Sequence, residues 1–194
     1  MLLFTGMPRS GTGFISKLLT EAGIPCGHES VYGFDKQGTK GEVIKVNFGK
    51  QGNWKAESSF MAAPFLEGHD VIHITRNPLR VISSLIENKA LKQDDQYTKF
   101  VYQNLPTLKN YEGIDKYLHF YIEWNKMIEP HPRHKIEDIN KDKEKWLSQF
   151  IKPEKIYTNE TYNRRTKPNY LNETPESKLK EDFIKTANRY GYII

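Results

Sequence analysis

The stretch MLLFTGMPRSGTGFISKLLTEAG, residues 1–23, decides the fold. Residues 1–5 form a short apolar run that ends at a glycine, which is typical of a buried parallel strand. Over 14–22 the apolar residues follow helical spacing, and Gly23 stands where a helix ends in a C-cap glycine. A strand, a glycine-containing loop over 6–13 and a helix therefore follow one another at the start of the chain.

The same order returns in the middle of the chain. Residues 71–75, VIHIT, are rich in β-branched side chains and predict a second buried strand. Pro78 suits the first turn of the helix that follows it. The rest of the pattern predicts a third strand over 134–139, helices over 95–105, 115–129 and 146–151, a short helix over 59–66, a last helix starting at Thr174-Pro175-Glu176, and irregular chain over 33–53 and 152–173.

Strands that alternate with helices imply right-handed βαβ units. We therefore expect one α/β domain over 1–194, in three layers, with helices flanking a central and mostly parallel sheet. Ligands on such sheets bind beyond the carboxyl ends of the strands. This rule singles out three loops, at 6–13, 76–80 and 137–138.

Composition narrows the class of protein. The chain has 194 residues, of which 37% are hydrophobic, and a formal net charge of +5. No apolar run approaches the ~20 residues of a membrane span, and no secretory signal opens the chain, so we expect no membrane contact. The single cysteine, Cys26, excludes an internal disulfide and favours a reducing, cytoplasmic setting. The mild basic excess suits a small anionic ligand better than nucleic acid.

The first loop has the composition of an anion cradle. Glycines let backbone amides turn toward one centre, and the helix behind them adds partial positive charge. Its spacing starts like a nucleotide P-loop, but Thr12 replaces the lysine and Gly13 replaces the hydroxyl residue that would hold Mg²⁺. The cation stands earlier, as Arg9. We expect phosphate or sulfate ester binding without a metal, by residues Pro8, Arg9, Ser10, Gly11, Thr12 and Gly13.

The second loop begins where the 71–75 strand ends. Arg76 projects over the edge of the sheet, and Ser84 follows it eight residues later, about two helical turns on. A planar guanidinium and a hydroxyl in this arrangement suit a second phosphate. Taken alone, this pair is better explained by an ordinary salt bridge of Arg76 and a neutral helical serine at Ser84.

Together the two loops resemble the sulfotransferase superfamily that uses 3′-phosphoadenosine 5′-phosphosulfate (PAPS). Its 5′-phosphosulfate loop is similar to residues 6–12, and its 3′-phosphate motif is similar to Arg76-Asn77-Pro78 followed by Ser84. Further similarity covers Ser58-Ser59, Ile136-Glu137-Asp138 and the late basic pair Arg164-Arg165. The resemblance implies a P-loop-like sulfotransferase fold and transfer of a sulfuryl group from PAPS to a hydroxyl or amine, leaving adenosine 3′,5′-bisphosphate.

The resemblance also implies roles for individual residues. Arg9 would stabilise the leaving 5′-phosphate oxygen, and Arg164 and Arg165 would close over the nucleotide. Gly27-His28-Glu29 follows the first helix and supplies a general base, either Glu29, which we favour, or His28. The histidines show no metal-ligand spacing, so we expect no metal site.

Two alternatives stay open. One is a divergent P-loop nucleotide kinase or NTPase, which needs Mg-ATP. The other is a non-catalytic module that kept the cradle and lost turnover. The acceptor is not encoded in any motif, and a carbohydrate or a small molecule is compatible with the aromatic residues of 30–55 and 88–115.

Overall fold

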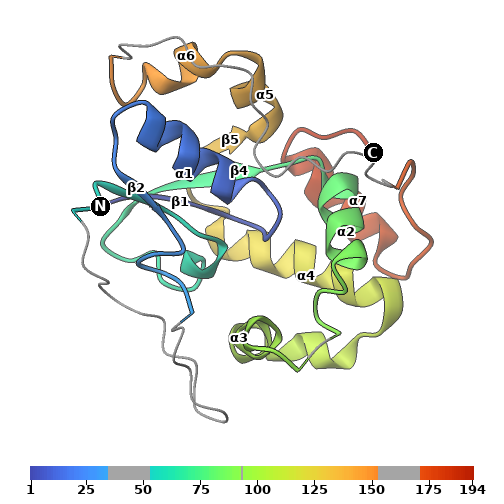
Figure 1. The fold of residues 1–194 in the computed structure, drawn as a ribbon. Helices are drawn as coiled ribbons and strands as arrows, with labels where there is room; N and C mark the ends of the chain where they lie inside the picture. The colour runs from blue at the N-terminus through green and yellow to red at the C-terminus, as the bar shows by residue number, and fades with distance from the viewer. Residues whose placement is uncertain (35–52, 93, 153–170) are drawn as a thin grey trace.

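The structure is a computed structural model and describes residues 1–34, 53–92, 94–152 and 171–194. Its centre is an all-parallel five-stranded sheet in the order β2-β3-β1-β4-β5 (Figure 1). The strands are β1 (Leu2–Gly6), β2 (Cys26–His28), β3 (Ala56–Ser58), β4 (Asp70–Thr75) and β5 (Arg133–Lys135). Because β1 is central, the loop after it has neighbours on both sides.

Helices cover both faces of the sheet, as the sequence predicted (Figure 1). One face carries α1 (Thr12–Glu21), α5 (Ile136–Lys141) and α6 (Lys143–Leu147), packed on one apolar cluster. The other face carries η1 (Phe60–Ala62), α2 (Pro78–Glu87), α3 (Gln96–Asn104), η2 (Pro106–Asn110), α4 (Gly113–Ile128) and α7 (Lys180–Arg189), packed on a second cluster. The chain is thus an α/β protein whose parallel sheet lies between two helical layers.

The sequence explains the longest elements. β1 and β4 are buried on both faces, which is why they read as apolar runs without alternation. α1 ends where Gly23 adopts a φ of 89°, in the left-handed region that a C-cap glycine favours. Pro78 is the first residue of α2, and the Asn77 side chain caps that helix by accepting the amide of Arg80 at 3.2 Å.

Two predicted elements are wrong in extent. The strand expected over 134–139 stops at Lys135, because Ile136 begins α5 and Glu137 and Asp138 lie in the first turn, where a helix favours acidic side chains. The last helix starts at Lys180 rather than at Thr174, because the Ser177 hydroxyl accepts the amide of Leu179 at 2.9 Å just before it.

Smaller differences concern short elements. The helix expected over 59–66 is a single 3₁₀ turn over 60–62, and the one expected over 146–151 covers 143–147. The three-residue strands β2 and β3 were not predicted. Most of the glycine-rich stretch 33–53 lies outside the described residues. Within the described ranges, no helix is long and apolar enough to cross a bilayer.

Candidate functional site

The loops that follow β1, β4 and β5 meet at the carboxyl edge of the sheet. Gly6 pairs with Ile74 across β1 and β4, and Thr75 pairs with Lys135 across β4 and β5. Parallel strands end at the same edge, so the three connections start side by side. The three sequence-predicted loops therefore lie next to one another.

The loop after β1 is shaped by unusual backbone angles. A Cβ at Gly6 would lie 2.1 Å from the carbonyl oxygen of Ile74, so only glycine fits there. Arg9 and Gly11 have φ values of 74° and 108°, in the left-handed region. These two residues turn the chain tightly into α1, which begins at Thr12. The amides at this turn and the start of the helix form the positive end of α1.

Buried polar groups line the same turn. Ser10 is fully buried, and its hydroxyl has no hydrogen-bond partner within the part of the chain that the structure describes. Buried polar atoms without partners are rare in folded proteins, and a site for a polar ligand is one explanation. The backbone at Thr12 is fixed by β3, because the Ser58 hydroxyl donates to the Thr12 carbonyl oxygen at 2.8 Å. Pro8 is buried, while the neighbouring Arg9 is exposed.

Arg9, Arg76 and Ser84 form one connected group. Nη1 of Arg76 donates to the carbonyl oxygen of Arg9 at 3.0 Å. Nε of Arg9 donates to the hydroxyl of Ser84, on α2, at 2.9 Å. The two motifs that the sequence placed 67 residues apart are thus in direct contact. Two guanidinium groups and a hydroxyl in one cluster are suited to binding phosphate groups through charge-assisted hydrogen bonds.

Glu137, on α5, connects the second loop with Tyr192 near the C-terminus. One carboxylate oxygen accepts the backbone amide of Asn77 at 2.9 Å, and the other accepts the Tyr192 hydroxyl at 2.9 Å. The sequence singled out Glu137 as part of a loop at the sheet edge but gave it no partner. Its position in the first turn of α5 brings the third loop into contact with Asn77, directly beside Arg76.

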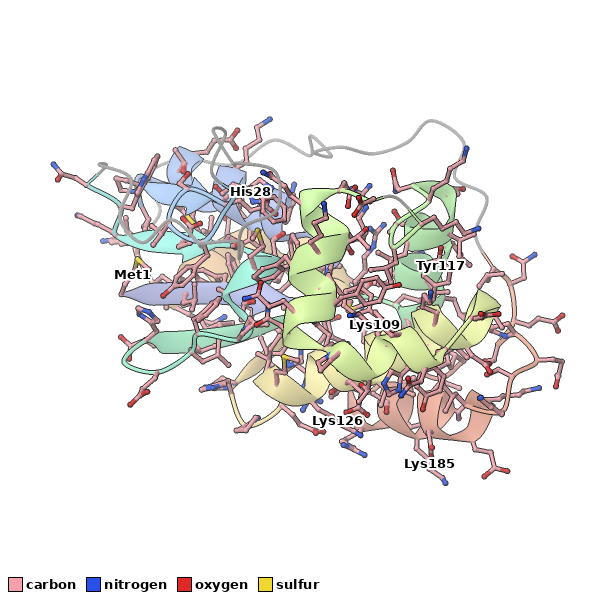
Figure 2. All side chains as sticks on the ribbon, turned by 90° about the horizontal axis from the view of Figure 1, so that it is seen from below. Met1, His28, Lys109, Tyr117, Lys126 and Lys185 are labelled. Carbon is pink, nitrogen blue, oxygen red and sulfur yellow. The ribbon has the colours of Figure 1, made fainter. Side chains whose placement is uncertain are left out.

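His28 and Glu29 follow β2 at the same edge of the sheet. Nδ1 of His28 lies 2.9 Å from the carbonyl oxygen of Ser58, so in the neutral ring Nδ1 carries the proton and Nε2 keeps its lone pair. Figure 2 shows exposed His28 beside the blue ribbon of the N-terminal elements. Glu29 has a φ of 53°, and burial raises the pKa of its carboxyl, although the positive charge of His28 acts in the opposite direction. Both groups can accept a proton.

Glu57 is a residue of this region that sequence analysis missed. It is fully buried in β3, and one of its oxygens accepts the amides of Ser30, Val31 and Tyr32 at 2.8, 3.2 and 3.4 Å. Burial raises the pKa of Glu57 while these hydrogen bonds lower it. A Cβ at Gly27 would lie 2.0 Å from its other oxygen. Glu57 thus fixes the turn that carries Glu29, and an acid between small residues in a three-residue strand gave no signal in the sequence.

The remaining predicted site residues have different outcomes. Gly13 is in the first turn of α1, next to Thr12. Arg164 and Arg165 lie outside the described residues. Within the described ranges, no group of three or more histidine, cysteine or acidic residues is arranged to hold a metal ion.

The site therefore combines a glycine loop at a helix N-terminus, a cluster of two arginines and a serine, and two candidate proton acceptors at the end of β2. Comparison with known proteins finds no matching family model, no matching curated protein and no matching solved structure.

Proposed function

We propose that the protein is a PAPS-dependent sulfotransferase with a P-loop-like sulfotransferase fold. The observation that carries the proposal is the contact between the two motifs: Arg76 bonds to the Arg9 carbonyl, and Arg9 bonds to Ser84. A donor with phosphate groups at both its 5′ and 3′ positions needs two phosphate-binding loops side by side. A simple glycine turn or an isolated surface arginine needs no such contact.

Each loop receives one end of the donor in this proposal. The amides from Ser10 to Gly13 and the Thr12 hydroxyl hold the 5′-phosphate at the N-terminus of α1. Arg76 and Ser84 hold the 3′-phosphate, which distinguishes PAPS from ATP. The Ser10 hydroxyl, buried without a partner among the described residues, is consistent with a polar ligand at this position.

The reaction transfers the sulfuryl group to an acceptor hydroxyl or amine. The bond between sulfur and the bridging 5′-phosphate oxygen breaks, a bond between sulfur and the acceptor atom forms, and the acceptor proton passes to Glu29. Arg9 offsets the negative charge that builds on the leaving phosphate oxygen. Burial raises the pKa of Glu29, which makes its carboxylate a better proton acceptor than an exposed one.

Calorimetry with adenosine 3′,5′-bisphosphate and with Mg-ATP tests the proposal. We expect the bisphosphate to bind more tightly and without added metal. Tighter binding of Mg-ATP would contradict the proposal and favour a nucleotide kinase or NTPase. Formation of sulfated product from labelled PAPS, over a broad acceptor panel, separates an enzyme from a non-catalytic binding module.

A further inference from the structure

A groove with a volume of about 460 Å³ lies between α1 and the outer edge of β2. β2 is the end strand of the sheet, so the groove runs along one side of the molecule. Its wall follows α1 from Gly13 to Glu21, a stretch of nine residues that spans about 12 Å at the helical rise per residue. The groove is thus elongated and is longer than a single hexose ring.

One end of the groove lies at the candidate site. Gly13 belongs to the turn where the first loop enters α1, and His28 and Ser30 flank Glu29 at the carboxyl end of β2. A molecule in the groove would have one end next to His28, one of the two candidate proton acceptors.

The other end of the groove is formed by an indole. Trp54 lines the groove and is 37% exposed, whereas the other two tryptophans, Trp124 and Trp146, are 0% and 4% exposed. Cys26 pairs with Ala56, two residues after Trp54, and the amide of Lys55 donates to the Pro25 carbonyl at 2.9 Å. Trp54 is therefore about four strand residues from His28, roughly 13 Å at the rise of a β-strand.

The wall between the two ends carries hydroxyl and charged side chains. Lys17 and Glu21 form an ion pair at 3.6 Å on the outer side of α1. The hydroxyls of Ser16 and Thr20 lie on the same wall and bond to the Cys26 carbonyl at 2.8 and 3.2 Å. One flat indole, with hydroxyl and charged groups around it, matches a sugar ring, which has an apolar face of C–H groups and a rim of hydroxyls. A phenol or a longer apolar acceptor is usually held in an enclosed pocket, whereas this groove is open to solvent along one side.

We infer that the acceptor is a saccharide chain that lies in this groove, with one ring stacked on Trp54 and the sugar to be sulfated next to His28, at the end of the groove that borders the candidate site. That the saccharide is an acceptor rests on the proposed function. Binding of a saccharide at Trp54 can be measured separately from that function.

The test uses the full chain and the fluorescence of Trp54. Because the other two tryptophans are buried, acrylamide should quench mainly Trp54. Cellotetraose, maltotetraose, chitotetraose and a heparan tetrasaccharide serve as saccharide probes, and 2-naphthol, followed by calorimetry, serves as the phenolic probe. We expect at least one tetrasaccharide to protect Trp54 from acrylamide, and 2-naphthol to bind more weakly than that tetrasaccharide.

Two variants at one position separate stacking from general disruption. Trp54→Leu should weaken binding of the protecting tetrasaccharide by about tenfold or more, whereas Trp54→Tyr, which keeps an aromatic face, should retain most of it. Both variants should bind adenosine 3′,5′-bisphosphate like the original protein, because Trp54 lies away from the two phosphate loops.

Each outcome bears on one idea only. If no tetrasaccharide protects Trp54, if Trp54→Leu binds the tetrasaccharide unchanged, or if 2-naphthol alone binds in a Trp54-dependent manner, the saccharide inference is wrong, and the nucleotide proposal is unaffected. If the bisphosphate fails to bind while the saccharide does, the sulfotransferase proposal fails and the saccharide groove remains.

Discussion

Arg76 is the side chain that we assign to the 3′-phosphate of the donor. Its guanidinium contacts the first loop through the Arg9 carbonyl, and it stands at the end of β4. We expect Arg76→Ala to weaken binding of adenosine 3′,5′-bisphosphate by about 1.5–3 kcal/mol, the size of a hydrogen bond to a charged group. Calorimetry with the bisphosphate and with adenosine 5′-phosphosulfate, which lacks the 3′-phosphate, measures this loss.

The control is Arg80→Ala in the first turn of α2, which begins after Arg76, and it should leave both ligands bound as before. The loss caused by Arg76→Ala should be confined to the ligand with a 3′-phosphate. Equal weakening of both ligands would mean that Arg76 only shapes the first loop and does not hold the 3′-phosphate.

Glu29 tests the identity of the base. Glu29→Gln keeps the size of the side chain and removes the proton acceptor, so turnover should fall by about 10²–10⁴, the usual contribution of general base catalysis. Binding of the bisphosphate should not change. In the original protein kcat should decrease as pH falls through the raised pKa of Glu29, because the carboxylate becomes protonated.

His28→Asn is the matched variant for this experiment, because asparagine can still donate to the Ser58 carbonyl as Nδ1 of His28 does. If His28→Asn abolishes turnover while Glu29→Gln keeps it, the base is His28. Steady-state kinetics with labelled PAPS distinguishes the two assignments.

Glu57 joins β3 to the turn that follows β2. Burial raises the pKa of Glu57 above its ordinary value. The folded state therefore binds this proton more tightly than the unfolded state, and the contribution of Glu57 to stability falls as pH rises through the raised pKa. We expect Glu57→Gln, which keeps an oxygen acceptor without the charge, to be more stable than the original protein at pH 8.

The advantage of Glu57→Gln should shrink as the pH is lowered toward the ordinary carboxyl pKa, because Glu57 is protonated in both states below that pKa. Glu57→Ala should be less stable at every pH, because the amides of Ser30, Val31 and Tyr32 lose their acceptor. A buried amide without an acceptor, as at Tyr32, costs about 1–3 kcal/mol. Urea unfolding at pH 8 and pH 5 measures both effects. If Glu57→Gln stabilises the protein equally at the two pH values, the gain in stability does not come from removing the carboxylate charge.

Elements differ in how far the sequence predicts them, and length is the reason. β1 and β4 were predicted within one residue at each end, because a buried parallel strand of five or six residues leaves a clear apolar run. β2 and β3 have three residues each, too few for a period to be seen. For the last helix, Thr174 and Ser177 both satisfy the local capping pattern. The choice depends on Asp115, which bonds to the Ser177 hydroxyl from 62 residues away.

In the whole molecule, the candidate site too is predicted by the sequence in some features and not in others. The rule for parallel sheets predicted that the loops after β1, β4 and β5 share one edge. The contacts of Arg76 with Arg9 and of Asn77 with Glu137 confirm that they do. The order of the strands was not predictable, because no local signal says that β3 lies between β2 and β1. Glu57 reaches the turn after β2 only in this order, so its part in the site becomes visible only in three dimensions.

His73 links the sheet to α4 and to the end of α7, and we expect its burial to lower the stability of the fold in acid. It is fully buried in β4, and its Nε2 lies 2.9 Å from the side-chain oxygen of Asn125 on α4. That oxygen only accepts, so Nε2 carries the proton. Nδ1 is buried and has no partner among the described residues, and the ring lies edge-on to Tyr190 at 5.5 Å. A second proton at Nδ1 would place a positive charge without a partner in the core.

Burial lowers the pKa of His73 from 6.5 to about 4; the positive charges of Arg133 and His131 act in the same direction, and Asn125 and Glu129 oppose them. Below pH 6.5 the unfolded chain takes up a proton that the folded state refuses until about pH 4, so stability falls with decreasing pH across this window. The size of this effect is about 3 kcal/mol, at about 1.4 kcal/mol for each pH unit of the shift.

His73→Gln can still donate to Asn125 and does not titrate. The free energy of unfolding of this variant, relative to that of the original protein, should therefore rise steadily as the pH falls. Urea unfolding at pH 7, 5.5 and 4.5 measures this difference. Glu29, Glu57 and the other carboxyls titrate alike in both proteins, so their effects cancel. A difference that stays constant over this range would mean that His73 accepts its second proton in the folded state, and that Nδ1 has a partner or water within reach.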